Sequence, residues 1–340
     1  MSRFLRRSLP SLLLLLLFVV WPSIARAVEV SAYQAGAYQP GLMNLRDLAT
    51  PEPGLVLLDY NYLNLSSSYY DRDANKVSEI EVDLSTIDPT LGVETLDVSA
   101  QVSGYTNVPV VFYTFNIEAI KTKYMVSVAP VFMTSGYRMN VHFSEEDSTV
   151  SSSGNAGGFG DLALMPLGLG WSIEDKFDLG IFYTSYLPTG KYTTGASDNI
   201  GKGYWTHQFQ APVYSYFKDK SIALFFMPTF EVNGKVKDAD VRAGNRLTIE
   251  YGYSQYVTPW MELEVTNGHN WQVGDDRGAD VWWKGSALAV RDRTSSVGVG
   301  VGFWPWEMLN LRLKGAFDYG VKQRYRSNII SASLIFIPGF

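Results

Sequence analysis

Alternation of apolar and polar residues is the main pattern along this chain. It is clearest in residues 246–254 and recurs in residues 261–266 and 309–319. In the first two segments, one face comprises Leu247, Ile249, Tyr251, Tyr253, Met261, Leu263 and Val265, and the other comprises Arg246, Thr248, Glu250, Ser254, Glu262, Glu264 and Thr266. A period of two predicts β-strands with one apolar and one polar face.

The same pattern predicts about twelve strands joined by connections that alternate between long and short. The strands are expected at residues 54–66, 94–116, 123–141, 160–173, 176–188, 204–217, 221–233, 245–257, 260–268, 295–304, 308–319 and 326–340. Short turns are expected at 116–122, 174–176, 218–220, 258–259 and 305–307, and long loops at 67–93, 142–159, 189–203, 234–244 and 269–294. In the second strand, residues 104–109 predict a kink or a hairpin.

Two folds fit such strands: a soluble sandwich with its polar face outside, and a membrane barrel with its polar face inside. Alternating loop lengths favour the barrel, because outer-membrane barrels join their strands by short turns on the periplasmic side. Five tryptophans near predicted strand ends favour it too, although they could be ordinary core aromatics: Trp171, Trp205, Trp260, Trp304 and Trp306. We therefore expect an all-β fold, a transmembrane antiparallel β-barrel over residues 54–340, with both termini on the short-turn side.

Residues 1–27 are expected to be a cleaved export signal. Arg3, Arg6 and Arg7 precede an apolar run at residues 12–20, and Ala-Arg-Ala at 25–27 is a cleavage site. The run is too short to span a bilayer. Export without a helical anchor agrees with a barrel in the outer membrane of a Gram-negative-type bacterium.

Residues 28–53 have no clear alternation and end in a proline-glycine stop. The segment carries Arg46 and Asp47 together with the apolar residues Leu42, Met43, Leu45 and Leu48. We expect it to pack inside the barrel near the periplasmic mouth as a plug. A disordered periplasmic tail is the alternative, although such a tail should be less apolar.

Charge and composition exclude several functions. Without the four arginines of the signal, 24 basic residues face 34 acidic ones, a net charge of −10 that gives no case for nucleic-acid binding. The absence of cysteine excludes disulfides and thiolate metal sites. No zinc, phosphate-loop or dinucleotide motif is present, so we expect no metal, no cofactor and no enzyme activity. His142, His207 and His269 lack an evident orienting group, which leaves a barrel lipid hydrolase as a remote alternative.

Several short motifs occur in a recognisable order. They are YQPG at 38–41, NLRD at 44–47, PEPG at 51–54, GFGDL at 158–162, LPTGKY at 187–192 and NIG at 199–201. In this combination the chain resembles the MetA-pathway phenol-degradation family of outer-membrane β-barrel proteins over most of its mature length. The resemblance implies a barrel encoded near aromatic or hydrocarbon catabolism that takes up hydrophobic substrates.

The last strand also resembles a recognition signal. Leu334, Phe336 and the terminal Phe340 match the pattern that the barrel assembly machinery reads, with Pro338 at a position where an aromatic residue is usual. Membrane lipid, outer-leaflet lipopolysaccharide and the assembly machinery are therefore the expected partners, together with small hydrophobic molecules.

The expected lumen holds charged residues on neighbouring strands. Glu250, Glu262 and Glu264 precede a strand with Gly298, Gly300 and Gly302 at its inward positions, and Arg312 and Lys314 follow it. Acids and bases could create a transverse field across a passage or form ion pairs reaching over the glycines. A purely structural network is the alternative.

Three further residues, Asp161, Pro188 and Gly190, are expected to anchor loops rather than bind ligands. For the whole chain we expect an outer-membrane channel for passive uptake of small hydrophobic or aromatic compounds. A structural or adhesive barrel without transport is the main alternative.

Overall fold

The computed structural model describes residues 36–83, 93–143, 148–194, 196, 198–279 and 291–338. The predicted signal peptide, residues 28–35 and Phe340 lie outside these residues. Among the described residues, no helix is long and apolar enough to cross a membrane.

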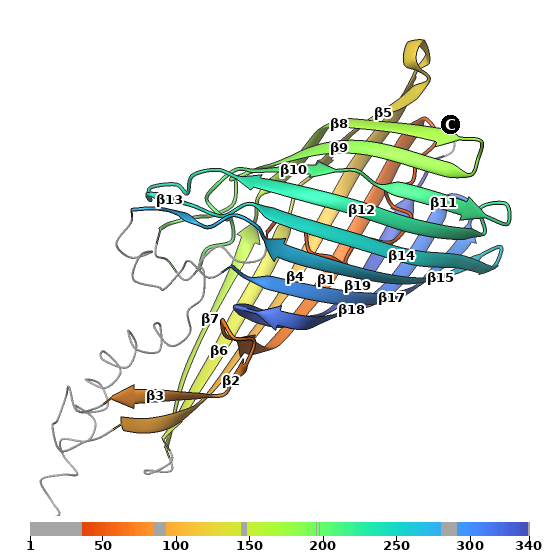
Figure 1. The fold of residues 1–340 in the computed structure, drawn as a ribbon. Coiled ribbons are helices and arrows are strands. Elements are labelled where there is room, and N and C mark those ends of the chain that lie inside the picture. Colours follow the sequence, from red (N-terminus) through yellow and green to blue (C-terminus); the bar gives the residue numbers. More distant parts are fainter. Residues whose placement is uncertain are drawn as a thin grey trace, which may run out of the picture.

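The described residues form a closed barrel of twelve antiparallel strands (Figure 1). Nine strands are single elements: β1 (Gly54–Tyr70), β4 (Val93–Ile117), β9 (Phe177–Leu187), β12 (Ile222–Asn233), β14 (Arg246–Thr258), β15 (Met261–Gln272), β17 (Arg293–Trp306), β18 (Leu309–Lys322) and β19 (Arg324–Phe336). Three consist of two segments each: β5 (Thr122–Ala129) with β6 (Phe132–Phe143), β7 (Ser148–Phe159) with β8 (Leu162–Ile173), and β10 (Thr206–Gln210) with β11 (Val213–Phe217). Pairing of β1 with β19 closes the barrel. Because the number of strands is even, the start of β1 and the end of β19 lie on the same side of the barrel. This is the side of the short turns, which is periplasmic in outer-membrane barrels.

Two details of the strand prediction are wrong. Residues 148–159 of the expected loop form β7, which pairs with β6 along its whole length. Its sequence is rich in serine and glycine, and no apolar alternation marks it because it lies where β6 and β7 extend past the other strands (Figure 1). The kink or hairpin expected at 104–109 is absent, since β4 pairs with β1 from Val102 to Thr114 without a register shift.

Short elements lie outside the barrel wall. They are β2 (Lys76–Val77), β3 (Glu79–Asp83), β13 (Val241–Arg242), β16 (Arg277–Gly278) and the 3-10 turn η2 (Glu118–Ile120). The strand β3 extends the sheet beside β4, and β13 pairs with β16. Figure 1 shows β3, β4, β6 and β7 projecting at the end opposite the C-terminus, which is the extracellular end.

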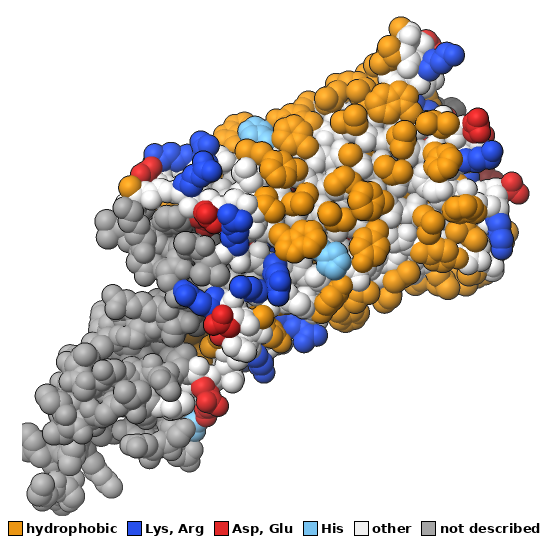
Figure 2. All heavy atoms as spheres, viewed as in Figure 1, with side chains coloured by type: hydrophobic (Ala, Val, Ile, Leu, Met, Phe, Trp, Pro, Cys, Tyr) orange, Lys and Arg blue, Asp and Glu red, His pale blue; other side chains and the backbone are white. Residues whose placement is uncertain are grey.

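The apolar face of the strands points outward. The side chains of Leu263, Val299, Leu313 and Ile330 are 45–54% exposed, whereas the alternate positions are buried and mostly polar. Figure 2 shows hydrophobic side chains over most of the visible face of the barrel wall, here called the apolar belt. Soluble proteins rarely expose apolar patches of this extent. The exterior is therefore that of a membrane barrel and excludes the soluble sandwich.

The tryptophans behave in two ways. Trp205, Trp260 and Trp306 are exposed near strand ends, as expected for aromatic rings at a membrane interface. Trp304 was expected there too, and that prediction is wrong: its Nε1 donates to the Tyr256 hydroxyl at 3.2 Å inside the barrel. The reason is the alternation of β17, in which the neighbouring Phe303 takes the exposed position.

Candidate functional site

Residues 36–53, here called the lumen segment, lie inside the barrel and contact its wall. Leu45 is fully buried and packs in a cluster with Tyr214, Phe225 and Met227 of the wall. Its carbonyl accepts a hydrogen bond from the Tyr214 hydroxyl at 2.8 Å. The described part of the expected plug is thus packed against the inner wall and is not a free tail.

Carboxylates of the wall hold the backbone of the lumen segment. A buried segment without regular structure has N–H groups that need acceptors, and carboxylates are the strongest acceptors available. The pairs are Ala37 N and Tyr38 N with Glu231 at 2.8 and 2.7 Å, Gly41 N with Glu250 at 3.1 Å, and Leu45 N with Glu264 at 2.9 Å. The Tyr38 hydroxyl also donates to Glu250. Glu231 was not predicted from the sequence as a lumen residue, although its inward position on β12 follows from the exposed Phe230 beside it.

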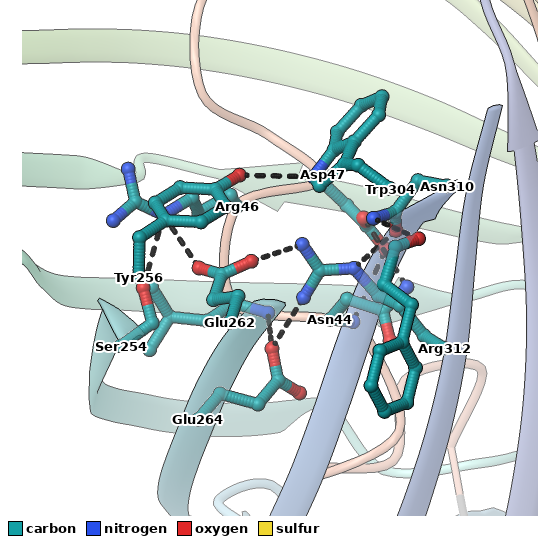
Figure 3. Close-up of polar contacts among 12 residues, drawn as sticks. Asn44, Arg46, Asp47, Ser254, Tyr256, Glu262, Glu264, Trp304, Asn310 and Arg312 are labelled. Atoms are coloured by element: carbon teal, nitrogen blue, oxygen red, sulfur yellow. Dashed lines mark hydrogen bonds and ion pairs between the residues drawn. The ribbon is translucent and has the colours of Figure 1, made fainter. Parts of the chain in front are cut away.

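Arg46 fastens the periplasmic part of the lumen segment. Its Nε lies 2.6 Å from a Glu262 oxygen, and its Nη1 donates to the Lys220 carbonyl at 2.9 Å. The guanidinium also lies 4.8 Å from the centre of the Tyr256 ring, within the range of a cation–π contact. Figure 3 shows Arg46 meeting Glu262 from the side opposite Arg312.

The predicted acids and bases of the wall form ion pairs over the glycine strand. Arg312 contacts Glu262 and lies 3.0 Å from Glu264 (Figure 3). The Lys314 Nζ lies 2.9 Å from Glu264 on its other side. A Cβ at Gly302 would be 3.2 Å from the Arg312 Cζ, and one at Gly300 would be 2.9 Å from the Glu264 Cγ. The glycines leave the room in which these long side chains meet. The structure therefore shows an ion-pair ladder and not two separated rows of charge.

Asp47 turns toward the other side of the lumen. It accepts a hydrogen bond from the Tyr60 hydroxyl at 2.6 Å and one from the Asn44 N–H at 3.1 Å. Burial raises the pKa of the Asp47 carboxyl above its usual value, and the Arg312 charge opposes part of that rise.

A cavity of about 390 Å³ lies between the lumen segment and the wall. Apolar side chains of four strands line its wall side, among them Val56, Leu58, Val110, Phe112, Ala129 and Met165. Arg46, Asp47 and Arg312 also line it, whereas Glu250, Glu262, Glu264 and Lys314 do not. Its volume falls within the usual range for small-molecule sites.

These apolar wall positions were not predicted from the sequence. Residues 55–58 and 110–113 are apolar on both faces of their strands, so alternation does not reveal an inward face there. The signal that could have revealed them is the continuous apolar run itself. One face of these strands meets lipid, so apolar residues on the other face indicate an apolar patch in the lumen, whereas a purely polar lumen would give apolar and polar residues in alternation.

The predicted loop anchors lie together at the break between β7 and β8. The Asp161 carboxylate accepts the backbone N–H groups of Gly190 at 3.2 Å and Lys202 at 3.0 Å. Pro188 follows β9 directly, and the next residue, Thr189, accepts the Leu162 N–H at 3.0 Å. Asp161 therefore ties both ends of the 188–205 loop to the wall.

Replacing Asp161 by alanine is expected to free this loop. Two backbone N–H groups lose their acceptor, which corresponds to about 1–3 kcal/mol of local stability. Limited trypsin digestion should then cut faster at Lys191 and Lys202. The matched control is Asp198→Ala in the same loop, because Asp198 is an exposed partner of Lys191 and should matter little. Equal cleavage of the two variants would contradict the anchoring role.

The three histidines are separate and do not form a hydrolase site with the described residues. His142 Nδ1 faces the Thr149 hydroxyl and His207 Nδ1 faces that of Tyr183. His269 Nδ1 lies 2.8 Å from the Ser295 Oγ, but none of the described carboxylates orients its ring. Among the residues that the structure describes, no group of three or more His, Asp or Glu side chains is placed to bind a metal ion.

Fold and site together define an outer-membrane β-barrel whose lumen is shared by an internal segment and an apolar cavity. Residues 85–334 match the family described as "Putative MetA-pathway of phenol degradation". The chain belongs to this family, in agreement with the motifs found in its sequence. No curated protein matches the chain.

Solved structures show the same fold. The COG4313 outer membrane channel from Pseudomonas putida F1 is 16% identical, with a TM-score of 0.63 over 90% of this chain and 99% of that one. A FadL homologue from Pseudomonas aeruginosa is 9% identical, with a TM-score of 0.44 over 91% and 98% of the two chains. The TodX deltaS2S3 mutant, a monoaromatic hydrocarbon channel, is 11% identical, with a TM-score of 0.42 over 86% and 91%. The first of these likenesses supports the barrel fold.

Proposed function

We propose that this protein is a channel for the passive uptake of small hydrophobic or aromatic compounds across the outer membrane. The observation that carries the proposal is the apolar cavity inside the barrel, because a lumen built only for structure would be filled with paired polar groups. Membership of a phenol-degradation family supports aromatic cargo. The similar barrel from Pseudomonas putida F1 is an outer membrane channel, which agrees with this function.

The two halves of the lumen would have different tasks. On the side of β12 to β18, the carboxylates hold the backbone of the lumen segment, and the ion-pair ladder lies beside it. On the side of β1, β4, β5 and β8, apolar side chains would take up the cargo. Transfer then needs no energy source, because the cargo moves down its gradient and gains an apolar environment on the way.

A structural or adhesive role is the second candidate. The projection of β3, β4, β6 and β7 beyond the barrel favours it, because such a surface could bind another cell or matrix. Deleting the gene separates the two roles. Impaired growth on phenol or alkanes at limiting concentration, restored by the gene, supports uptake, whereas normal uptake with altered adhesion supports the structural role.

Filling the cavity tests the uptake proposal directly. Ala129 is buried at the cavity wall, so Ala129→Trp is expected to occupy part of the volume and to lower the rate of phenol or toluene entry into proteoliposomes several-fold. The matched control is Ala332→Trp on the lipid-facing side of β19, which should leave the rate unchanged. Equal uptake rates for both folded variants would contradict a path through this cavity.

A further inference from the structure

Three cations lie on the outer face at the extracellular end of the barrel: Arg293 of β17, Lys322 of β18 and Arg326 of β19. Arg293 and Arg326 are exposed, and their chain neighbours Asp292, Thr294 and Ser327 are buried inside. Arg293 and Lys322 are direct cross-strand partners. Figure 2 shows basic side chains along this edge of the apolar belt.

This arrangement has an electrostatic cost in the protein alone. Directly opposed side chains on one face lie about 5 Å apart, and like charges at that spacing are destabilising. None of the described carboxylates forms an ion pair with any of the three cations. Asp318 of β18 and Asp292, which precedes β17, are buried, and Asp292 pairs inside with Arg246 and Arg324.

Among the described residues, the neighbouring 71–75 turn forms no ion pair with these cations. The Asp71 carbonyl accepts the Gln323 N–H, which places the 71–75 turn beside the end of β18. The Asp71 carboxylate, however, accepts the N–H groups of its own turn from Asp73 and Asn75, both at 2.8 Å. Arg326 Nε donates to the carbonyl of Asp318, a neutral acceptor.

An aromatic cluster marks the membrane boundary just below the cations. His269 stacks on Trp271 with ring centres 5.5 Å apart and meets Tyr319 edge-on at 6.4 Å. Trp271 is the cross-strand partner of Arg293. Amphipathic rings settle at the level of lipid head groups, so the cations lie where the charged head groups of the outer leaflet are.

We propose that Arg293, Lys322 and Arg326 bind the phosphate groups of a phosphorylated, multiply acylated glycolipid of the outer leaflet. A phosphate between Arg293 and Lys322 turns their repulsion into two charge-assisted hydrogen bonds, and the planar guanidinium suits its oxygens. The acyl chains lie along the exposed Val299, Leu313 and Phe317 below.

The opposite end of the barrel differs in its charge pattern. There two of the turn cations have acidic partners: Lys176 pairs with Glu174, and Lys220 pairs with Asp175. The hydrogen bond from Lys220 lowers the pKa of Asp175 below its usual value, which keeps that pair charged. The row of Arg293, Lys322 and Arg326 faces lipid at the extracellular end and has no acidic partner among the described residues. A phosphorylated glycolipid of the outer leaflet would meet it there.

Native mass spectrometry of the full mature chain, released from detergent with lipid A carrying two phosphates, tests the proposal. The variant is Arg293→Gln with Lys322→Gln, and the matched control is Lys121→Gln with Lys218→Gln at exposed periplasmic turns. If each cation contributes about 1 kcal/mol, the variant binds lipid A about 30-fold more weakly, and the control binds like the wild type. Adding Arg326→Gln should weaken binding further.

Two other probes identify the source of the phosphate. Removing the phosphates from lipid A should weaken its binding to the wild type at least as much as the double substitution weakens binding of intact lipid A. Inorganic phosphate at the same concentration should not bind, since it lacks the acyl chains. Equal binding of lipid A by the double variant and the control would overturn the proposal. It would also be overturned if the wild type bound lipid A equally well with and without its phosphates. Retained transport of aromatic compounds by the double variant would leave the uptake proposal standing in either case.

Discussion

Replacing Arg312 by glutamine is expected to lower the free energy of unfolding by about 3 kcal/mol, the lower end of the range for breaking a buried ion pair. Arg312 is buried and contacts both Glu262 and Glu264, which are themselves buried. The loss stays at the lower end because Arg46 and Lys314 remain beside these acids. Urea titration of the folded barrel in lipid vesicles would measure it.

Two variants make this measurement specific. Arg291→Gln removes an equal charge from an exposed pair with Asp275 and should leave the unfolding midpoint unchanged. Glu264→Gln combined with Arg312→Gln should be less destabilising than the sum of the two single changes, because the groups share one network. A midpoint for Arg312→Gln equal to that of Arg291→Gln would show that the ladder adds nothing to stability.

Deleting residues 36–50 is expected to open an aqueous pore through the barrel. The deletion removes Arg46 and the backbone N–H groups that now occupy Glu231, Glu250 and Glu264. Single-channel conductance in planar bilayers should rise strongly, and the current should be carried mainly by cations, because these carboxylates would line the pore.

A shorter deletion of residues 30–35 is the control, since it keeps every described contact of the lumen segment. Its conductance should equal that of the full mature chain. If folded protein without residues 36–50 conducts no better than this control, the lumen segment does not obstruct the passage. Folding of each variant is checked by its heat-dependent mobility in electrophoresis.

Local patterns in the sequence were enough to predict the strands and their two faces. Alternation in β14, β15 and β18 assigned Glu250, Glu262 and Arg312 to one side, and glycines at Gly300 and Gly302 marked where long side chains could cross. Such patterns are readable because neighbouring side chains of a strand point to opposite faces whatever the rest of the chain does.

Pairing between distant strands could not be predicted in the same way. The strand β7 shows no apolar alternation, because it lies beyond the apolar belt. Its backbone hydrogen bonds to β6 stabilise it as a strand. Trp304 was assigned to the membrane interface from its position near a strand end, but the register of β17 turns it inward. Both errors come from features that depend on neighbours far along the chain.

Alternation along the chain was enough to predict β-strands with one apolar and one charged face, and loop lengths were enough to predict that the apolar face meets lipid. The folded barrel adds two features: wall carboxylates hold the backbone of residues 36–53, and an apolar cavity remains beside them. Periodicity could not reveal these two features, because it depends on neighbouring residues alone. Burial, hydrogen-bond partners and empty volume arise only when strands far apart in sequence close around one another.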